Sequence, residues 1–188
     1  MALAFLCPVY KRASCPRTAL LFRGSMTASQ LLIIDVQAGF INEWTAHVPT
    51  RVASLQESFD QILVTRLYNP QKSLYRKLIG WSGFSLGSIG SQLAFVPRPD
   101  AKIIDKSTYS CVNEAFVDRL RRDGIARVHL CGIGTDSSVL MSAVDLFQAG
   151  IEPVILAHAC ASASGHADHQ AGLQILRRLI GEKQVIGS

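Results

Sequence analysis

The chain has 188 residues, of which 48% are hydrophobic, and a formal net charge of +5. This length suits one globular domain with a sizeable core, and the hydrophobic content excludes a disordered protein. Residues 1–25 contain Lys11, Arg12, Arg17 and Arg23 without any acidic residue, which leaves only +1 for the rest of the chain. We therefore expect no nucleic-acid surface, because the basic charge lies in a leader and not in a patch on the domain.

Residues 1–25 form a leader whose apolar runs are too short to cross a bilayer, so no membrane association is expected. The lack of acidic residues is typical of a transit peptide, but the charges do not precede the apolar stretch as they do in a secretory signal. We favour an extended translation start or a tag, followed by one domain over residues 26–188. The cysteines of that domain show no CxxC spacing, which favours a reducing compartment, and we expect the cytoplasm.

Apolar runs alternate with helix-period segments throughout the domain. The strands are predicted at residues 31–36, 61–66, 101–105, 127–131, 152–156 and 184–186. The helices are predicted at residues 49–59, 112–122, from 138 to just before Gly150, and 168–179. Continuous apolar strands separated by helices predict a three-layer α/β/α fold, doubly wound around a mainly parallel sheet of about six strands. The glycine- and serine-rich stretch 81–91 is expected to be a mobile surface loop at a pocket rim.

Polar residues follow the strand ends at which parallel sheets bind ligands. Asp35 follows the first strand and Lys106 the third. The stretch CGIGTDSSVL, residues 131–140, is a strand-to-helix turn that contains Ser138. Taken singly, a turn-capping carboxylate, a solvated lysine and a helix-capping serine are the ordinary explanations. Taken together, they form a candidate site at one edge of the sheet.

The chain resembles the isochorismatase-like hydrolase superfamily in the segments LLIIDVQAGFIN, IIDKSTYS and VHLCGIGTDSSVLMSAVDLFQAGIEPVILAHACAS, and it is most similar to the cysteine hydrolase and amidase branch. The resemblance implies a Rossmann-like fold and an Asp, Lys, Cys triad, which falls on Asp35, Lys106 and Ser138. It also implies a cis peptide between Ile133 and Gly134, and an oxyanion hole made by the amides of Gly134 and Ser138.

Serine at the cysteine position changes the chemistry that this resemblance implies. Moving a proton from a thiol to a carboxylate costs about 6 kcal/mol. The same transfer from a serine hydroxyl, whose pKa is near that of water, costs on the order of 15 kcal/mol. Three readings therefore stay open. The protein is a C–N hydrolase of small amides or carbamoyl compounds with weakened or altered activity, an isochorismatase-type vinyl-ether hydrolase that needs no nucleophile, or a ligand-binding pseudoenzyme.

Further residues are candidates for binding a small-molecule substrate. Phe40 occupies the position of a pocket aromatic in the superfamily, and Trp81, Tyr109 and Arg66 are weaker candidates. We expect no metal, because the segment TRLYNPQKS lacks the histidine of the nicotinamidase metal cluster.

No organic cofactor is expected either, since the glycine pattern at residues 132–134 lacks the third glycine of a dinucleotide site. His158, His166 and His169 are interpreted as surface histidines. The resemblance implies a homo-oligomer, either a dimer or a tetramer.

Overall fold

The computed structural model describes residues 28–187, so the predicted leader lies outside the described residues. The strands are β1 (Gln30–Ile34), β2 (Gln61–Leu67), β3 (Lys102–Lys106), β4 (Arg127–Ile133), β5 (Glu152–Ala161) and β6 (Val185–Ile186). The α-helices are α1 (Val48–Leu55), α2 (Leu74–Leu78), α3 (Glu114–Arg122), α4 (Ser138–Gln148) and α5 (His166–Ile180). Short 3-10 turns lie at Ala38–Phe40, Gln56–Ser58, Ile89–Ser91 and Glu182–Gln184.

The strands form one sheet in the order β3-β2-β1-β4-β5-β6, and every pairing in it is parallel. This confirms the predicted doubly wound α/β fold. The chain leaves β1 toward β2 on one side and later continues from β4 toward β5 on the other. The carboxyl ends of β1 and β4 therefore lie at the topological switch point, where such sheets bind ligands.

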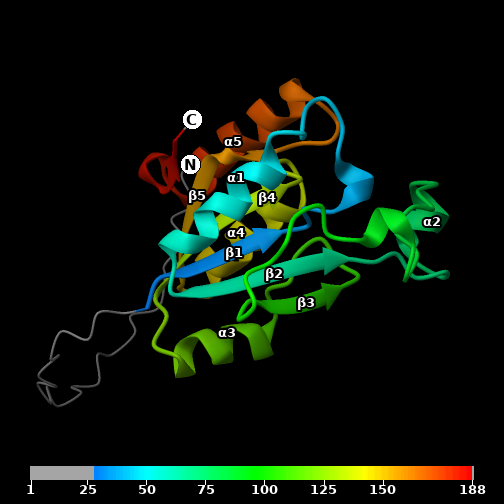
Figure 1. Cartoon of the computed structure of the whole chain (residues 1–188). Coiled ribbons are helices and arrows are strands. Elements are labelled where there is room, and N and C mark those ends of the chain that lie inside the picture. Colours follow the sequence, from blue (N-terminus) through cyan, green and yellow to red (C-terminus); the bar gives the residue numbers. More distant parts are fainter. Residues whose placement is uncertain (1–27, 188) are drawn as a thin grey trace, which may run out of the picture.

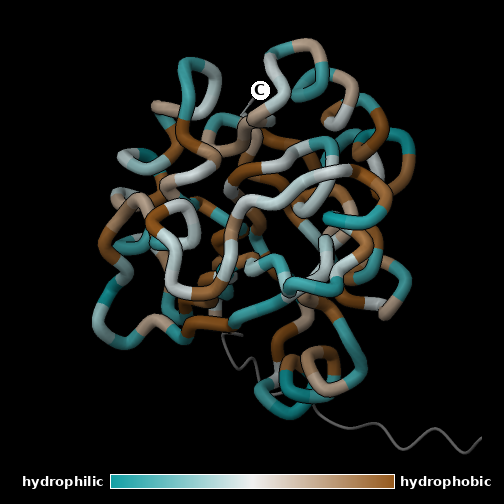
Figure 2. The backbone as a smooth tube through the Cα atoms, turned by 90° about the vertical axis from the view of Figure 1, so that its right-hand side faces the viewer, coloured by the Kyte–Doolittle hydropathy of each residue, from teal (hydrophilic) through white to brown (hydrophobic). Residues whose placement is uncertain are grey.

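Helices cover both faces of the sheet (Figure 1). Right-handed crossovers on opposite sides of the switch point place α1 on one face and α4 on the other. Strand β1 is fully buried between them, which explains its uninterrupted apolar sequence. Figure 2 shows the hydrophobic stretches running through the interior, while many outer loops are hydrophilic. None of the helices within residues 28–187 is long and apolar enough to cross a membrane.

Strand β5 continues beyond the predicted end at residue 156 and reaches Ala161. The segment after Leu156 is rich in alanine, which has a low strand propensity, so the local sequence does not predict a strand there. This segment forms a strand because it pairs with β4, where Gly132 lies opposite Cys160 and Ile133 opposite Ala161. Only Ile155 and Leu156 pair with β6, so the outer edge of β5 after Leu156 has no partner strand among the described residues.

The short helix α2 was not predicted, because its five residues are too few to show a helical period. Ser73 begins it, and its side chain accepts a hydrogen bond from the amide of Arg76. The next segment, residues 81–91, contains no longer element than the 3-10 turn at Ile89–Ser91, as expected for a loop.

Candidate active site

Asp35 and Lys106 form a buried ion pair at the carboxyl edge of the sheet. Lys106 Nζ lies 2.6 Å from Asp35 Oδ2, and the two side chains are 4% and 1% exposed. Thr65 Oγ1 donates to the other carboxylate oxygen at 2.6 Å. Lys106 Nζ also donates to the carbonyl oxygens of Thr108, at 3.0 Å, and Tyr109, at 2.9 Å. All three ammonium hydrogens therefore have acceptors, and the lysine holds the carboxylate in one position.

The backbone brings Asp35 and the β4–α4 turn close together. Asp35 has a φ of +51°, which is uncommon outside glycine and concentrates at functional sites. On the neighbouring strand, Gly132 lies opposite Ile34. A Cβ on Gly132 would stand 2.0 Å from the carbonyl oxygen of Ile34, so only glycine permits this approach.

The turn after β4 places Ser138 at the first position of α4, where it is nearly buried. Gly134 makes the bend with a φ of +89°. A Cβ there would come within 2.6 Å of Ser137 Oγ and 3.3 Å of the Ser138 amide nitrogen. The Ser138 amide opens the helix and therefore has no acceptor within it, which leaves it as a donor for a developing negative charge.

The predicted cis peptide between Ile133 and Gly134 is not present, because no cis peptide bond occurs within residues 28–187. The positive φ of Gly134 makes the turn with a trans bond instead. The amide of Gly134 then donates to the carbonyl oxygen of Ala161 at 2.8 Å, next to the amide of Thr135 at 3.1 Å. In this arrangement the Gly134 amide anchors the turn to β5, and of the two predicted oxyanion donors only Ser138 is available.

An aromatic pocket of about 180 Å³ opens beside this turn. Its lining includes Phe40, Tyr75, Trp81, Tyr109, Gly134 and Ser138. The rings of Phe40 and Trp81 stack at 6.1 Å with an interplanar angle of 17°, and Tyr75 meets the edges of Trp81 and Tyr109. The structure thus brings the predicted residues Phe40, Trp81 and Tyr109 to the same pocket as Ser138.

Arg66, another predicted binding residue, does not line this pocket. Its guanidinium forms a bidentate pair with Asp105, at 2.7 and 2.9 Å, on an exposed face. Side chains alternate along β2, so Thr65 and Leu67 face Asp35 and the pocket while Arg66 faces away. The structure thus does not bring Arg66 to the pocket that Phe40, Trp81 and Tyr109 share with Ser138.

Three residues that the sequence reasoning missed support the site. Thr65 fixes Asp35, and Tyr75 lines the pocket with a pKa raised to about 12, chiefly by burial and then by the nearby Tyr109 and Asp35. Gln37 donates from Nε2 to the carbonyl oxygens of Leu67 and Ser91, which ties the loop 89–91 to β2. Thr65 could have been identified from the sequence, because it is a polar residue within an otherwise apolar predicted strand.

The cysteines of the described chain do not replace the missing nucleophile. Cys111, Cys131 and Cys160 are buried and free. Burial raises the pKa of Cys111 to about 12, although the charge of Lys106 acts in the opposite direction. Burial likewise raises the pKa of Cys160 to about 12 and that of Cys131 well above its ordinary value. These thiols are therefore poor nucleophiles near neutral pH.

The histidines belong to a different part of the molecule. His158, His166 and His169 were predicted to be surface residues, and they line a second groove that shares no lining residue with the aromatic pocket. Within residues 28–187, no group of three or more His, Cys, Asp or Glu side chains is arranged to hold a metal ion.

Comparison with known proteins agrees with this architecture. The family model described as the Isochorismatase domain matches residues 29–184. No curated protein sequence matches the chain. Several solved structures share its fold at low sequence identity. An isochorismatase-like hydrolase from Alkaliphilus metalliredigens has a TM-score of 0.72 and 19% identity, covering 84% of this chain and 93% of the other.

A pyrazinamidase/nicotinamidase from Streptococcus mutans has a TM-score of 0.72 and 20% sequence identity, and the match covers 85% of this chain and 100% of the other. A cysteine hydrolase from Pseudomonas syringae has a TM-score of 0.73 and 17% sequence identity, and the match covers 85% of this chain and 88% of the other. At these identities the structural likeness establishes the fold, and the match to the family model covers most of the chain. The chain thus belongs to the isochorismatase-like hydrolase family.

Proposed function

We propose that this protein hydrolyses the C–N bond of a small planar amide, slowly in its present form because serine stands where the family's cysteine hydrolases have their nucleophile. The observation that carries the proposal is the buried Asp35–Lys106 pair, whose lysine donates to the carbonyl oxygen of Tyr109, a residue that lines the same aromatic pocket as Ser138. A pocket of about 180 Å³ lies below the 300–1,000 Å³ typical of drug-sized ligands, which favours a substrate of one ring.

The aromatic walls favour a planar group that packs against the rings lining the pocket. Edge-to-face and stacked arrangements contribute about 0.5–1.5 kcal/mol for each aromatic contact beyond burial. The structural neighbour from Streptococcus mutans is a pyrazinamidase/nicotinamidase, so nicotinamide and pyrazinamide are the first compounds to test.

In the proposed reaction, Ser138 Oγ attacks the amide carbonyl carbon and its proton passes to the carboxylate of Asp35. The Ser138 amide stabilises the oxyanion, at the positive end of the α4 dipole. The proton then moves from Asp35 to the leaving nitrogen, the C–N bond breaks, and ammonia departs. Water hydrolyses the resulting ester, which regenerates Ser138 and releases the carboxylic acid. Lys106 holds Asp35 in place throughout and takes no proton.

A non-catalytic binding protein is the second candidate, and one observation favours it. The Gly134 amide donates to Ala161 and is unavailable to an oxyanion, so the site has lost a donor as well as a thiol. Removing one oxyanion donor typically costs a factor of about 10²–10³ in rate. A protein of this kind would still bind a planar ring in the aromatic pocket.

The test is ammonia release from nicotinamide, pyrazinamide and a panel of small amides and carbamoyl compounds. We expect slow release that both Ser138→Ala and Asp35→Asn abolish. Saturable binding of nicotinamide without ammonia release from any compound would instead support the binding protein. If isochorismate were cleaved and no amide were, the nucleophile-independent reaction would replace our proposal.

A further inference from the structure

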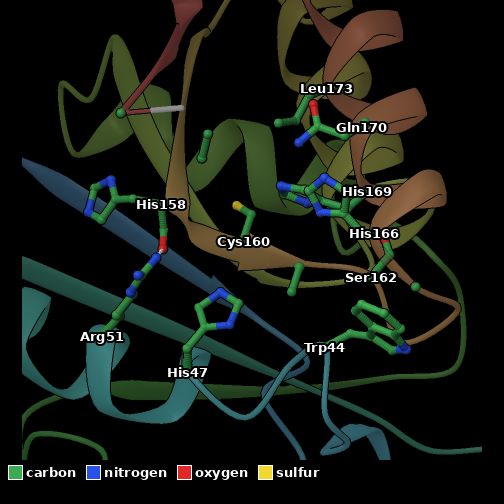
Figure 3. A pocket seen from close by; sticks show the side chains of 14 residues that line it. Trp44, His47, Arg51, His158, Cys160, Ser162, His166, His169, Gln170 and Leu173 are labelled. Atoms are coloured by element: carbon green, nitrogen blue, oxygen red, sulfur yellow. Dashed lines mark hydrogen bonds between the residues drawn. The ribbon is translucent and has the colours of Figure 1, made fainter.

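A second groove, of about 440 Å³, lies along the outer edge of β5 between α1 and α5. Figure 3 shows Arg51 of α1 reaching toward His158, and His47 at the start of α1 across the strand from His166 and His169 of α5. This is the part of β5 that extends beyond its pairing with β6. The groove is separate from the aromatic pocket described above, and the two share no lining residue.

The groove is lined by cationic and neutral groups, with no acidic side chain among its lining residues. Arg51 is a permanent cation, and one of its terminal nitrogens donates to the carbonyl oxygen of His158. The guanidinium keeps further N–H donors for a ligand. His166 and His169 stand with ring centroids 6.2 Å apart, and the charge of His47 reaches His169 as well.

The N-terminus of helix α5 adds backbone donors to the same region. Helix α5 begins directly after Gly165 without a side-chain cap, whereas at the start of α1 the Val48 amide donates to the Thr45 carbonyl oxygen and Pro49 has no N–H. The first amides of a helix lack intrahelical acceptors and carry partial positive charge. The geometry therefore supplies an arginine, several imidazoles and free amides around one hollow, which is the donor set that binds an oxyanion.

His169 has one ring nitrogen fixed and one left for a ligand. Its Nδ1 lies 2.8 Å from Thr135 Oγ1. When the buried Thr135 hydroxyl donates to Nδ1, the neutral ring carries its hydrogen on Nε2. In the protonated ring both nitrogens donate, and Thr135 Oγ1 then accepts. Both states leave Nε2–H as a donor.

We infer that this groove is a binding site for a small molecule carrying a carboxylate or phosphate group, held by Arg51, His47, His166 and His169. This inference does not rest on the proposed amidase activity. The groove exceeds the volume of an inorganic anion, so it has room for the remainder of a small organic ligand beside the charged group.

The charges around these histidines give the site a predictable pH dependence. Burial and the neighbouring Arg51 lower the pKa of His47, against a hydrogen bond to the Cys160 backbone. Burial, His166 and His47 lower the pKa of His169, and the charge of Asp136 opposes them. A bound anion favours the protonated rings and raises both pKa values. Binding therefore takes up protons, and affinity increases as the pH falls from about 8 to about 6.

Calorimetric titration of the full chain at constant ionic strength tests the inference. Sulfate, which keeps its charge between about pH 6 and 8, is the phosphate-shaped probe, and succinate is the carboxylate probe. We expect saturable binding of at least one probe, tighter at the lower pH. The probe that binds more tightly identifies whether the ligand carries phosphate or carboxylate.

Two substitutions locate the binding. Arg51→Gln should weaken it by about tenfold or more, since a charge-assisted hydrogen bond is lost. His166→Gln, a substitution at an exposed position, should weaken it as well. Arg122→Gln, an exposed arginine on α3, is the matched control and should bind as the unaltered chain does. Absence of binding by both probes, or binding that neither Arg51→Gln nor His166→Gln weakens, would overturn the inference.

Discussion

Replacing Ser138 by cysteine distinguishes two hypotheses: a hydrolase whose nucleophile is weak, and a binding protein that has no catalytic activity. The substitution exchanges one atom at the first position of α4, so the packing of the turn changes little. A hydroxyl with a pKa near 15.7 is replaced by a thiol with a pKa near 8.5, and at 1.36 kcal/mol per pKa unit, proton transfer to Asp35 becomes about 10 kcal/mol easier. The helix N-terminus lowers the thiol pKa further.

Only part of this difference in proton-transfer free energy lowers the activation barrier of the rate-limiting step. If a third of it does, about 3 kcal/mol, the rate of ammonia release should rise by about two orders of magnitude. The assay compares Ser138→Cys with the unaltered chain on the amide panel, and adds Asp35→Asn in the cysteine background, which should remove the gain. Circular dichroism checks that each variant is folded.

Alkylation by iodoacetamide provides a readout that needs no substrate. The new thiol at position 138 should react at neutral pH, whereas Cys111, Cys131 and Cys160 should not, because burial raises their pKa values. Peptide mapping identifies the modified residue. A folded Ser138→Cys variant that is alkylated at position 138 and yet hydrolyses no amide would refute the amidase proposal. A variant that is not alkylated there would refute our account of the turn.

Three further predictions concern the residues around Ser138. Lys106→Met leaves the Asp35 carboxylate buried without its cation and should cost about 3–5 kcal/mol of stability in urea unfolding. Gly132→Ala should lower the unfolding free energy by more than about 3 kcal/mol, because its Cβ would stand 2.0 Å from the Ile34 carbonyl; Gly87→Ala, also at positive φ but in open space, should cost only about 1 kcal/mol. Trp81→Ala in the Ser138→Cys background should raise KM for nicotinamide more than it lowers kcat, and an unchanged KM would place the ring elsewhere.

The fold could be predicted largely from local sequence, since long apolar runs and helical periods alternate along the chain. Parallel topology then brings the ends of β1, β3 and β4 to one edge, which is why Asp35, Lys106 and Ser138 could be grouped from the sequence alone. Arg66 lies away from the aromatic pocket, and the alternation of side chains along β2 could have shown this from the sequence. Alternation along β2 assigns Thr65 and Leu67 to one face and Arg66 to the other.

Other features depend on contacts between distant segments. The Gly134 amide donates to the carbonyl oxygen of Ala161, which is distant in sequence, and strand β5 extends because β4 pairs with it. His47 and His169 are distant in sequence and meet only because α1 and α5 flank the same strand. The periodicity of a single helix or strand carries no information about contacts between distant elements, so the second groove was not predicted.

The Asp35–Lys106 pair permits a final prediction that separates stability from function. Desolvating two charges costs several kcal/mol per ion, so a buried ion pair is a poor stabiliser compared with apolar side chains of similar size. The double substitution Asp35→Asn with Lys106→Met removes both charges, keeps an acceptor for Thr65, and places at position 35 a residue type that tolerates its positive φ. It should therefore recover most of the stability that Lys106→Met alone loses, measured by urea unfolding. In the Ser138→Cys background it should abolish ammonia release completely. A double variant as unstable as the single one would mean that the pair is kept for the fold, and the strongest support for a catalytic site at this edge of the sheet would be lost.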